Sequence, residues 1–525
     1  MTTYQWFVFF LIVQLIHGLG TWKLYENSGR KSWEAFIPVY NSIVLMKIIN
    51  RPTWWTFLLF IPVINLLMFP IIWVETLRSF GKKTTLDTIL GVVTLGFYIY
   101  YINYTQDVQH IADRSLKPTN ATADTISSLL FAVIVATFVH GYFIQPFVIP
   151  SSSLEKTLLI GDFLFVSKQN YGARTPMTPI AAPMVHDSLP IIHTLSYVAK
   201  PQLPYFRFPS FEKIKNNDIV VFNWPRDTLF NMYKPADKRY DKPIDKKTNY
   251  VKRCVGIPGD SLQIKNGIVF INGKELILPE RAKPQYSYKV TLDPNSTTDF
   301  ERVFKDLNIT DGYGYERAER DTLTILAITF DSAEKLKSVS GITSIKRVIK
   351  KGPEDGVFPD FQDGKPSVNN NWSGDNFGPI YIPQAGKTVA LDKNTLPLYK
   401  IIINEYEGNT LKVVGNDIFV NDKKATTYTF KQDYYWMMGD NRHNSLDARY
   451  FGYTPENHIV GKPIFIWMSW DSSASGLNKI RWERLFTTVN GEGQPESYFK
   501  YFLVFLGIYF VGEYFWKKRK AKKTE

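Results

Sequence analysis

One serine in the chain has surroundings that suit nucleophilic chemistry. Ser153 lies in the run Phe147-Val-Ile-Pro-Ser-Ser-Ser-Leu-Glu-Lys-Thr-Leu158, next to the end of a long apolar segment, 126–148. A hydroxyl at that place would reach substrates that lie in or emerge from a membrane. No motif pairs Ser153 with a histidine and an aspartate, so the candidate base is another kind of residue.

Lys252 is that candidate base. A lysine accepts a proton only when it is neutral, which requires burial to lower its pKa from about 10.4 toward roughly 7 to 8. If residues 250–255 form a strand, Tyr250, Lys252 and Cys254 share one face. Arg253 then points to the other face, so its positive charge is directed away from Lys252.

Apolar segments must position these two residues. Five are visible: 4–19, 54–74, 89–104, 126–148 and 501–516. A membrane-spanning helix needs about 20 residues, so only the second and the fourth have a comfortable length. The first segment lacks a basic start and an Ala-x-Ala site, so we expect an uncleaved anchor.

Basic residues predict the orientation of these segments only in part. The loop 21–52 is rich in them and is expected to be cytoplasmic; it carries Lys23, Arg30, Lys31, Lys47 and Arg51. Four spans would then place Ser153 outside, but they would also place the basic residues near 78–83 outside, against the same rule. Pro62 and Pro70 could make segment 54–74 re-entrant, so the topology of residues 1–120 stays open.

The last apolar segment gives a clearer signal. The basic run 517–523 follows it directly and is typical of a cytoplasmic flank. If that segment spans, the polar region 150–497 is outside. The chain carries a net charge of +13, but we expect no nucleic-acid partner, because no basic stripe is interleaved with stacking aromatic residues. Its single cysteine, Cys254, excludes an intrachain disulfide, and no Cys or His cluster has the spacing of a zinc site.

The polar region alternates short β-type runs with turn signals. The runs are 218–224, 250–255, 267–271 before Asn272-Gly273, and 417–421. We therefore expect a mainly antiparallel β domain. Residues 281–399 are richer in Asn, Asp, Gly and Pro, and we interpret them as an insertion.

Three ordered motifs resemble the serine, lysine and C-terminal boxes of bacterial type I signal peptidases, the leader peptidases with a Ser/Lys dyad. They are Ile149-Pro-Ser-Ser-Ser-Leu154, Tyr250-Val-Lys-Arg-Cys-Val-Gly-Ile-Pro-Gly-Asp260 and Met438-Gly-Asp-Asn-Arg-His-Asn-Ser-Leu-Asp-Ala-Arg449. The resemblance covers about 125–280 and 405–470. It implies a multi-pass α-helical membrane region plus a mainly antiparallel β catalytic domain with a large insertion.

The expected domains combine the apolar segments and the polar region with this resemblance, whose motifs do not cover the first 120 residues or the insertion. They are a multi-pass N-terminal membrane region at 1–122, a transmembrane anchor at 123–149, a catalytic β domain at 150–280 and 400–490, the insertion at 281–399, a C-terminal transmembrane segment at 498–517 and a basic cytoplasmic tail at 518–525.

The resemblance also implies roles for single residues. Ser153 would be the nucleophile and Lys252 its general base, with Ser445 orienting the lysine. The hydroxyl of Ser151 and the backbone N–H of Ser153 would form an oxyanion hole. Pockets for small substrate side chains would draw on Phe147, Ile149, Pro150, Leu154 and Tyr250, and supporting ion pairs on Arg253, Asp440, Asp447 and Arg449.

The implied activity is removal of signal peptides from exported preproteins that carry small residues at −1 and −3. No metal or organic cofactor is expected. The implied location is the bacterial cytoplasmic (inner) membrane, with the catalytic domain on the periplasmic side, in contact with membrane lipid and with the secretion machinery.

Four positions depart from the family pattern. Ser152 stands where a glycine is usual, Leu154 where a methionine is, Lys156 where a proline is, and His443 where an aspartate is common. Two other classes of function stay open at this point. One is a non-catalytic membrane module that binds exported chains, and the other is a self-cleaving Ser/Lys regulator, which would be expected to carry a DNA-binding domain.

Overall fold

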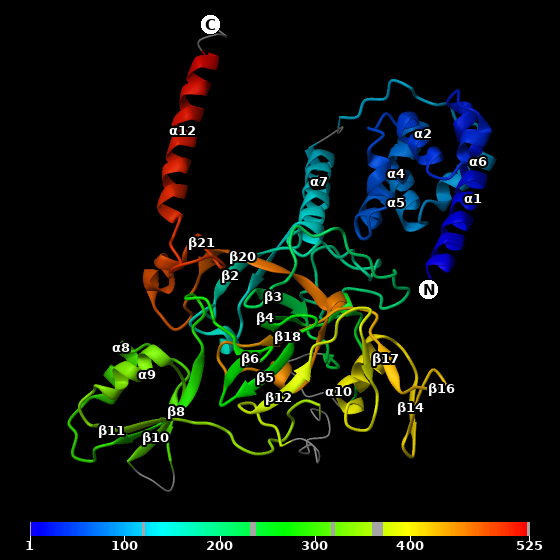
Figure 1. Ribbon diagram of the computed structural model, residues 1–525. Coiled ribbons are helices and arrows are strands. Elements are labelled where there is room, and N and C mark those ends of the chain that lie inside the picture. Colours follow the sequence, from blue (N-terminus) through cyan, green and yellow to red (C-terminus); the bar gives the residue numbers. More distant parts are fainter. Residues whose placement is uncertain (1, 118–120, 231–237, 317–320, 360–370, 522–525) are drawn as a thin grey trace. The chain divides into compact units, whose positions relative to one another are not determined.

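The computed structural model describes residues 2–117, 121–230, 238–316, 321–359 and 371–521 and divides into two compact units (Figure 1). Unit 1 comprises Met1–Ile144, Ala173–Phe208 and Thr228–Lys247, and unit 2 comprises Gln145–Gly172, Pro209–Asp227 and Thr248–Glu525. Every site residue expected from the sequence therefore belongs to unit 2.

Unit 1 is helical and has its own apolar core. Its helices are α1 (Thr3–Asn27), α2 (Tyr40–Ile48), α3 (Trp55–Leu58), α4 (Ile64–Ser79), α5 (Thr85–Val93), α6 (Phe97–Thr105) and α7 (Ala121–Tyr142). Helix α1 begins at a capping box, in which the Thr2 side chain accepts a hydrogen bond from the backbone of Gln5 and the Gln5 side chain accepts one in return. The core gathers buried side chains from several helices, among them Tyr25, Met46 and Ile64.

The second and third apolar segments are each broken. Residues 59–63, which include Pro62, separate the short helix α3 from α4. Helices α5 and α6 are bent by 117° against each other. Gly96, with φ of 86°, lies at that bend in the left-handed region that glycine adopts without steric strain. Neither segment therefore forms one straight helix.

An ion-pair cluster shows that segment 54–74 doubles back. Glu75 is buried, and its carboxylate lies 2.8 Å from Arg51 and 2.7 Å from Arg114. Arg78 approaches the same carboxylate at 3.8 Å. If the segment crossed a bilayer, Arg51 and Glu75 would be separated by about 30 Å of hydrocarbon. The contact favours the re-entrant alternative, in which the basic residues near 78–83 would lie on the same side of a membrane as loop 21–52.

Within the described ranges, α1 and α7 are the helices long and apolar enough to cross a membrane. Helix α7 ends at Tyr142, and strand β1 (Ile144–Val148) follows it, so the helix covers the expected anchor at 123–149 only as far as Tyr142. The physical reason is Pro146, which lacks a backbone donor and disfavours helical geometry in the residue before it.

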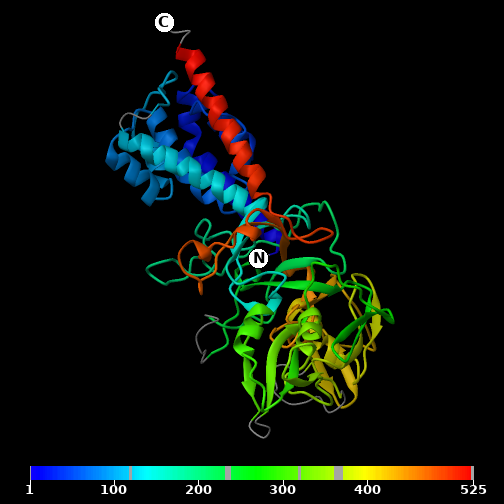
Figure 2. The same cartoon turned by 90° about the vertical axis from the view of Figure 1, so that its left-hand side faces the viewer.

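Helix α12 (Phe499–Ala521) covers the expected C-terminal segment as one uninterrupted helix, coloured red in Figures 1 and 2. It is not among the helices that meet the length and hydropathy criteria for a span, so a crossing at 498–517 stays a prediction. The expected tail, 518–525, begins as the last turn of this helix, and residues 522–525 lie outside the described part of the chain.

The main sheet of unit 2 has the order β1-β2-β20-β3-β4-β18-β19, and β21 pairs with β20. Its further strands are β2 (Asp162–Ser167), β3 (Ile219–Asn223), β4 (Asn249–Gly256), β18 (Tyr434–Met438), β19 (Thr454–Pro455), β20 (Ile459–Ser469) and β21 (Thr487–Thr488). The pairs from β2 to β18 are antiparallel, as the sequence predicts. Strand β4 carries the lysine box between β3 and β18, and β18 leads directly into the third box.

The expected insertion folds around a core of its own. Strands β8 (Gln285–Leu292), β9 (Tyr313–Tyr315), β10 (Thr322–Thr329) and β11 (Ile342–Arg347) form a sheet with the order β11-β8-β10-β9. Helices α8 (Phe300–Asp306) and α9 (Phe330–Lys337) pack on it, with Phe304 and Leu336 in the shared core (Figure 1).

Smaller sheets complete unit 2. Strand β12 (Phe377–Tyr381) pairs with β5 (Ser261–Lys265), which pairs with β6 (Ile268–Ile271) and through it with β7 (Lys274–Glu275). The other elements are β13 (Thr388–Ala390), β14 (Leu411–Val414), β15 (Asp417–Val420), β16 (Lys423–Lys424), β17 (Thr427–Thr429), α10 (Leu396–Ile401) and α11 (Ala448–Phe451). Because β12 pairs with the hairpin that follows the lysine box, the end of the expected insertion is built into the framework of the site.

The insertion core should be sensitive to truncation of its buried leucine. Leu323 on β10 is completely buried, whereas Leu326 on the same strand is 50% exposed. We expect Leu323→Ala to destabilise this subdomain by about 2 to 5 kcal/mol, because it removes buried methyl groups and leaves a cavity. Hydrogen exchange of the β8–β10 amides measures the change. Leu326→Ala is the matched control, and equal effects of the two variants would contradict the assigned core.

Candidate active site

The serine box and the lysine box meet in unit 2. Ser153 lies in a 3₁₀ turn, Ser152–Leu154, that follows β1, and Lys252 lies on β4. Lys252 Nζ is 2.7 Å from Ser153 Oγ, within hydrogen-bond distance. Both residues are buried, with exposed fractions of 8% for Ser153 and 4% for Lys252. The two side chains therefore form a contact that is shielded from bulk water.

Burial sets the acidity of the lysine. Removal of Lys252 from water disfavours its charged form and lowers its pKa to about 8, while the carboxylates of Asp447 and Asp440 act in the opposite direction. The amine also lies 5.2 Å from the centroid of the Tyr250 ring. About a tenth of the amine is therefore neutral at pH 7, and this fraction rises with pH, as a general base requires.

A buried ion pair joins the lysine strand to the third box. Both nitrogens of the Arg253 fork bind the Asp440 carboxylate, at 2.8 and 2.6 Å. Thr157, in the turn after Ser153, donates a third hydrogen bond to Asp440 at 2.7 Å. Burial alone would raise the pKa of Asp440, but the Arg253 charge and these bonds outweigh it and hold the pKa below its usual value.

A second buried pair shapes the third box itself. Arg449 binds both oxygens of the Asp447 carboxylate, at 2.9 and 2.8 Å. The backbone N–H of Gly439 donates to the same carboxylate at 3.0 Å. Arg449 also donates to the carbonyl oxygen of Arg442. The loop between β18 and α11 is thereby closed on itself, and this loop carries Ser445.

Ser445 lies beside the nucleophile loop. A Cβ on Gly439 would collide with Ser445 Oγ and with the carbonyl oxygen of Ser153, so glycine is needed where the third box passes these groups. Ser445 Oγ is buried and has no hydrogen-bond partner among the described residues. Ser151 precedes the turn in an extended conformation, and its side chain is exposed. Their roles as lysine orienter and oxyanion donor stay predictions.

The expected pocket residues lie in three different settings. Ile149 and Leu154 belong to a buried cluster, against which Phe147 packs. Tyr250 instead stacks on Trp224 at a centroid distance of 5.2 Å. Pro150 is exposed between Ile149 and the serine run.

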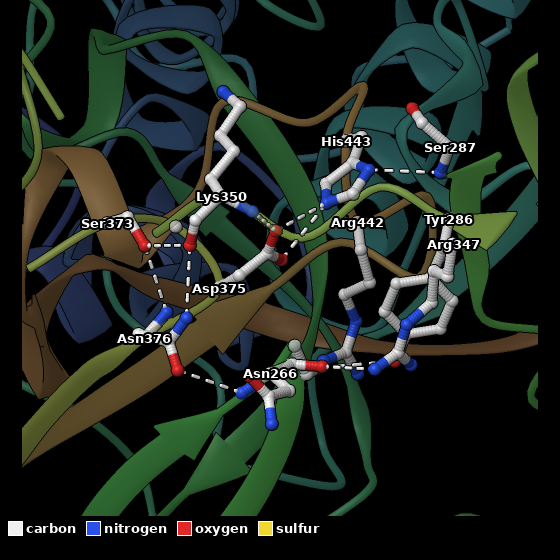
Figure 3. Close-up of polar contacts among 12 residues, drawn as sticks. Asn266, Tyr286, Ser287, Arg347, Lys350, Ser373, Asp375, Asn376, Arg442 and His443 are labelled. Atoms are coloured by element: carbon white, nitrogen blue, oxygen red, sulfur yellow. Dashed lines mark hydrogen bonds and ion pairs between the residues drawn. The ribbon is translucent and has the colours of Figure 1, made fainter. Parts of the chain in front are cut away.

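His443, the departure in the third box, connects three segments of unit 2. The backbone N–H of Ser287 on β8 donates to His443 Nδ1 at 3.0 Å, and His443 Nε2 donates to Asp375 at 3.0 Å (Figure 3). Because Nδ1 accepts a bond, the ring proton is on Nε2. The backbone N–H of Lys350 donates to the same aspartate at 2.8 Å. An aspartate in place of His443 could not span these partners, because it has no ring donor.

Several site residues were missed by the sequence analysis. They are Thr157, Val251, Asp311 and Asn441. Val251 packs on the cluster of Ile149 and Leu154, and strand alternation could have indicated it. Asn441 lies inside the third box and Thr157 three residues after the serine box, so their positions were a usable signal. Asp311 comes from the insertion, and its contact with Asn441 depends on tertiary structure. No group of residues suited to a metal ion occurs in the described ranges.

Comparison with known proteins gives the family of the chain. A model of the family "Signal peptidase, peptidase S26" matches residues 122–316 and 381–470, more than half of the chain. The chain belongs to this family and is a serine endopeptidase. The match continues through 281–316, so it includes part of the expected insertion. A second model, a family of unknown function (DUF5684), matches residues 33–113.

Three relatives illustrate the extent of the similarity. Signal peptidase I of Buchnera aphidicola subsp. Baizongia pistaciae is 23% identical over 66% of this chain and 76% of its own length. Signal peptidase I of Haemophilus influenzae is 23% identical over 71% of this chain and 78% of its own. Signal peptidase I of Rickettsia massiliae is 21% identical over 70% of this chain and 90% of its own.

The pair of Arg253 and Asp440 gives a stability prediction. Asp440→Asn should destabilise unit 2 by about 3 to 5 kcal/mol, because it leaves the Arg253 charge buried without a counter-charge. Urea unfolding of the detergent-solubilised protein measures this. Asp422→Asn is the matched control, because Asp422 forms an exposed pair with Lys412 and should change little. If Asp440→Asn lowers the free energy of unfolding no more than the control does, the buried pair does not hold the two boxes together.

Proposed function

We propose that this protein removes signal peptides from exported preproteins with Ser153 as nucleophile and Lys252 as general base. The observation that carries the proposal is the buried 2.7 Å contact between Lys252 Nζ and Ser153 Oγ. The same contact disfavours a non-catalytic binding module, because such a module has no need for a buried amine beside a hydroxyl. The self-cleaving regulator has no observation in its favour.

The proposed reaction begins with neutral Lys252. Its amine takes the Ser153 hydroxyl proton as Oγ attacks the scissile carbonyl, and the protonated amine then donates to the leaving nitrogen. Water activated by Lys252 would hydrolyse the acyl-enzyme. The backbone N–H of Ser153 and the hydroxyl of Ser151 would stabilise the oxyanion, and Ser445 would orient the lysine once substrate is bound.

The membrane topology would determine on which side of the membrane this reaction takes place. Crossings by α1 and α7, with the intervening loop 21–52 in the cytoplasm, would put Ser153 on the periplasmic side of the inner membrane. Ser153 follows the end of α7 closely in sequence. We expect the substrates to be preproteins with small residues at −1 and −3, delivered by the secretion machinery. The enzyme would contact them at the membrane, where it is itself in contact with lipid.

The dyad is tested with a preprotein that carries Ala at −1 and −3. Ser153→Ala and Lys252→Met should abolish its cleavage, because the nucleophile or its base is removed. The preprotein is incubated with purified enzyme in detergent, and gel electrophoresis measures the amount of cleaved product. Ser473→Ala and Lys424→Met, at exposed positions, should cleave as the wild type does. A dyad variant that cleaves the preprotein at the wild-type rate would refute the assignment of the dyad. The substrate preference has a separate test: if the wild type cleaves a preprotein with Leu at −1 equally fast, that preference is refuted.

The pKa of Lys252 predicts the pH dependence of the reaction. Because the base must be neutral, kcat/KM should rise with pH through an apparent pKa near the value of about 8 given by burial. Well below that value it should fall roughly tenfold per pH unit. Lys252→Arg should be inactive throughout, because a guanidinium does not deprotonate in proteins. A profile without a rising limb between pH 7 and 9 would contradict Lys252 as the base.

A further inference from the structure

Two of the four departures, Ser152 and Lys156, contact one loop of the insertion; Lys156 does so directly and Ser152 through one residue. This loop, 308–311, joins α8 to β9. Lys156 Nζ donates to Asn308 Oδ1 at 3.2 Å and to Thr310 Oγ1 at 3.0 Å. Ser152 Oγ accepts from Asn444 Nδ2 at 3.0 Å, and the same amide lies 3.2 Å from Asp311 Oδ2. The loop is therefore coupled to the residues on both sides of Ser153.

Asp311 also binds a residue that holds the nucleophile's backbone. The backbone N–H of Asn441 donates to the carbonyl oxygen of Ser153 at 3.1 Å. The Asn441 side-chain amide donates to the carbonyl oxygen of Ser152 at 3.2 Å and to Asp311 Oδ2. An ionised carboxylate only accepts hydrogen bonds, so it directs the NH₂ group of each asparagine toward itself and toward the serine turn.

The backbone at Lys156 adds a second constraint. Its φ of 69° lies in the left-handed region, which costs a non-glycine residue about 1 kcal/mol or more and persists where surrounding contacts hold it. Proline, with φ fixed near −65°, cannot adopt this conformation. The Lys156 side chain is 12% exposed, and its bonds to the loop fasten the turn in this shape.

We propose that loop 308–311 is a positioning element for the nucleophile. Asp311 orients the side-chain amides of Asn441 and Asn444, which bind the carbonyl oxygen and the hydroxyl of Ser152. The backbone N–H of Asn441 holds the carbonyl oxygen of Ser153. Lys156 fastens the following turn to the same loop. The inference rests on the proposed function of Ser153. In this proposal, part of the insertion supports the rate of the chemical step. A displaced nucleophile lowers kcat more than it weakens substrate binding.

Substitutions of Asp311 test the proposal on the full-length enzyme with the Ala −3/−1 preprotein. Asp311→Ala should lower kcat about tenfold and leave KM within about twofold, because the serine turn loses its orientation. Asp311→Asn should recover most of that loss, because its amide oxygen still accepts hydrogen bonds. Asp306→Ala is the matched control, since Asp306 belongs to the same insertion and its side chain is 71% exposed.

Lys156 gives an independent arm of the test. Lys156→Met keeps the length of the side chain but removes both donated bonds, and it should lower kcat several-fold, about threefold to tenfold, at unchanged KM. Lys337→Met is the control and should match the wild type, because Lys337 is an exposed lysine of the insertion that contains loop 308–311. Thermal unfolding is recorded for every variant.

The outcomes separate clearly. The proposal is overturned if Asp311→Ala keeps the wild-type kcat, if it raises KM alone, or if its loss of kcat accompanies a large fall in melting temperature that Asp311→Asn does not restore. Ser153→Ala separates this inference from the proposed function. If Ser153→Ala still cleaves, the proposed function fails. If Ser153→Ala is inactive and Asp311→Ala equals the wild type, only the role of the loop fails.

Discussion

Burial of the Lys252 amine beside Ser153 is the interaction on which the rest of unit 2 depends. An amine held out of water is costly when charged, so its pKa falls, and the folded chain must supply enough stability elsewhere to keep it there. The two carboxylates near it work against this fall. Each of them is bound by its own arginine, which limits that opposition: Arg253 on Asp440 and Arg449 on Asp447.

The same two pairs organise the surrounding chain. Asp440 gathers the arginine of the lysine strand and the threonine of the serine turn, so three segments distant in sequence converge on one carboxylate. Asp447 accepts a hydrogen bond from the backbone N–H of Gly439 and so holds the two ends of the third box together. Main-chain pairing of β3, β4 and β18 provides the rigid base beneath these contacts. The strands hold the base Lys252 directly, whereas the nucleophile Ser153 lies in a turn and depends on the side-chain contacts around it.

The insertion is joined to this framework. Strand β8 contacts the third box through Ser287 and His443, and Asp375 fixes the other ring nitrogen of that histidine. The loop at 308–311 reaches the serine turn from another side. Departures from the family pattern at Lys156 and His443 therefore coincide with contacts to the insertion. This coincidence gives both substitutions a structural reason.

The sequence by itself determined the boxes, their order, the candidate dyad and the antiparallel β character of the domain, because these depend on local residue types and on alternation along strands. It also placed Arg253 and Lys252 on opposite faces, which the ladder between β3 and β4 reproduces. Only the tertiary structure decided that segment 54–74 doubles back, that helix α7 gives way to strand β1 after Tyr142, and that Asp311 meets Asn441. These facts depend on pairings between residues far apart in the chain, and no local pattern encodes which distant partner satisfies a buried carboxylate.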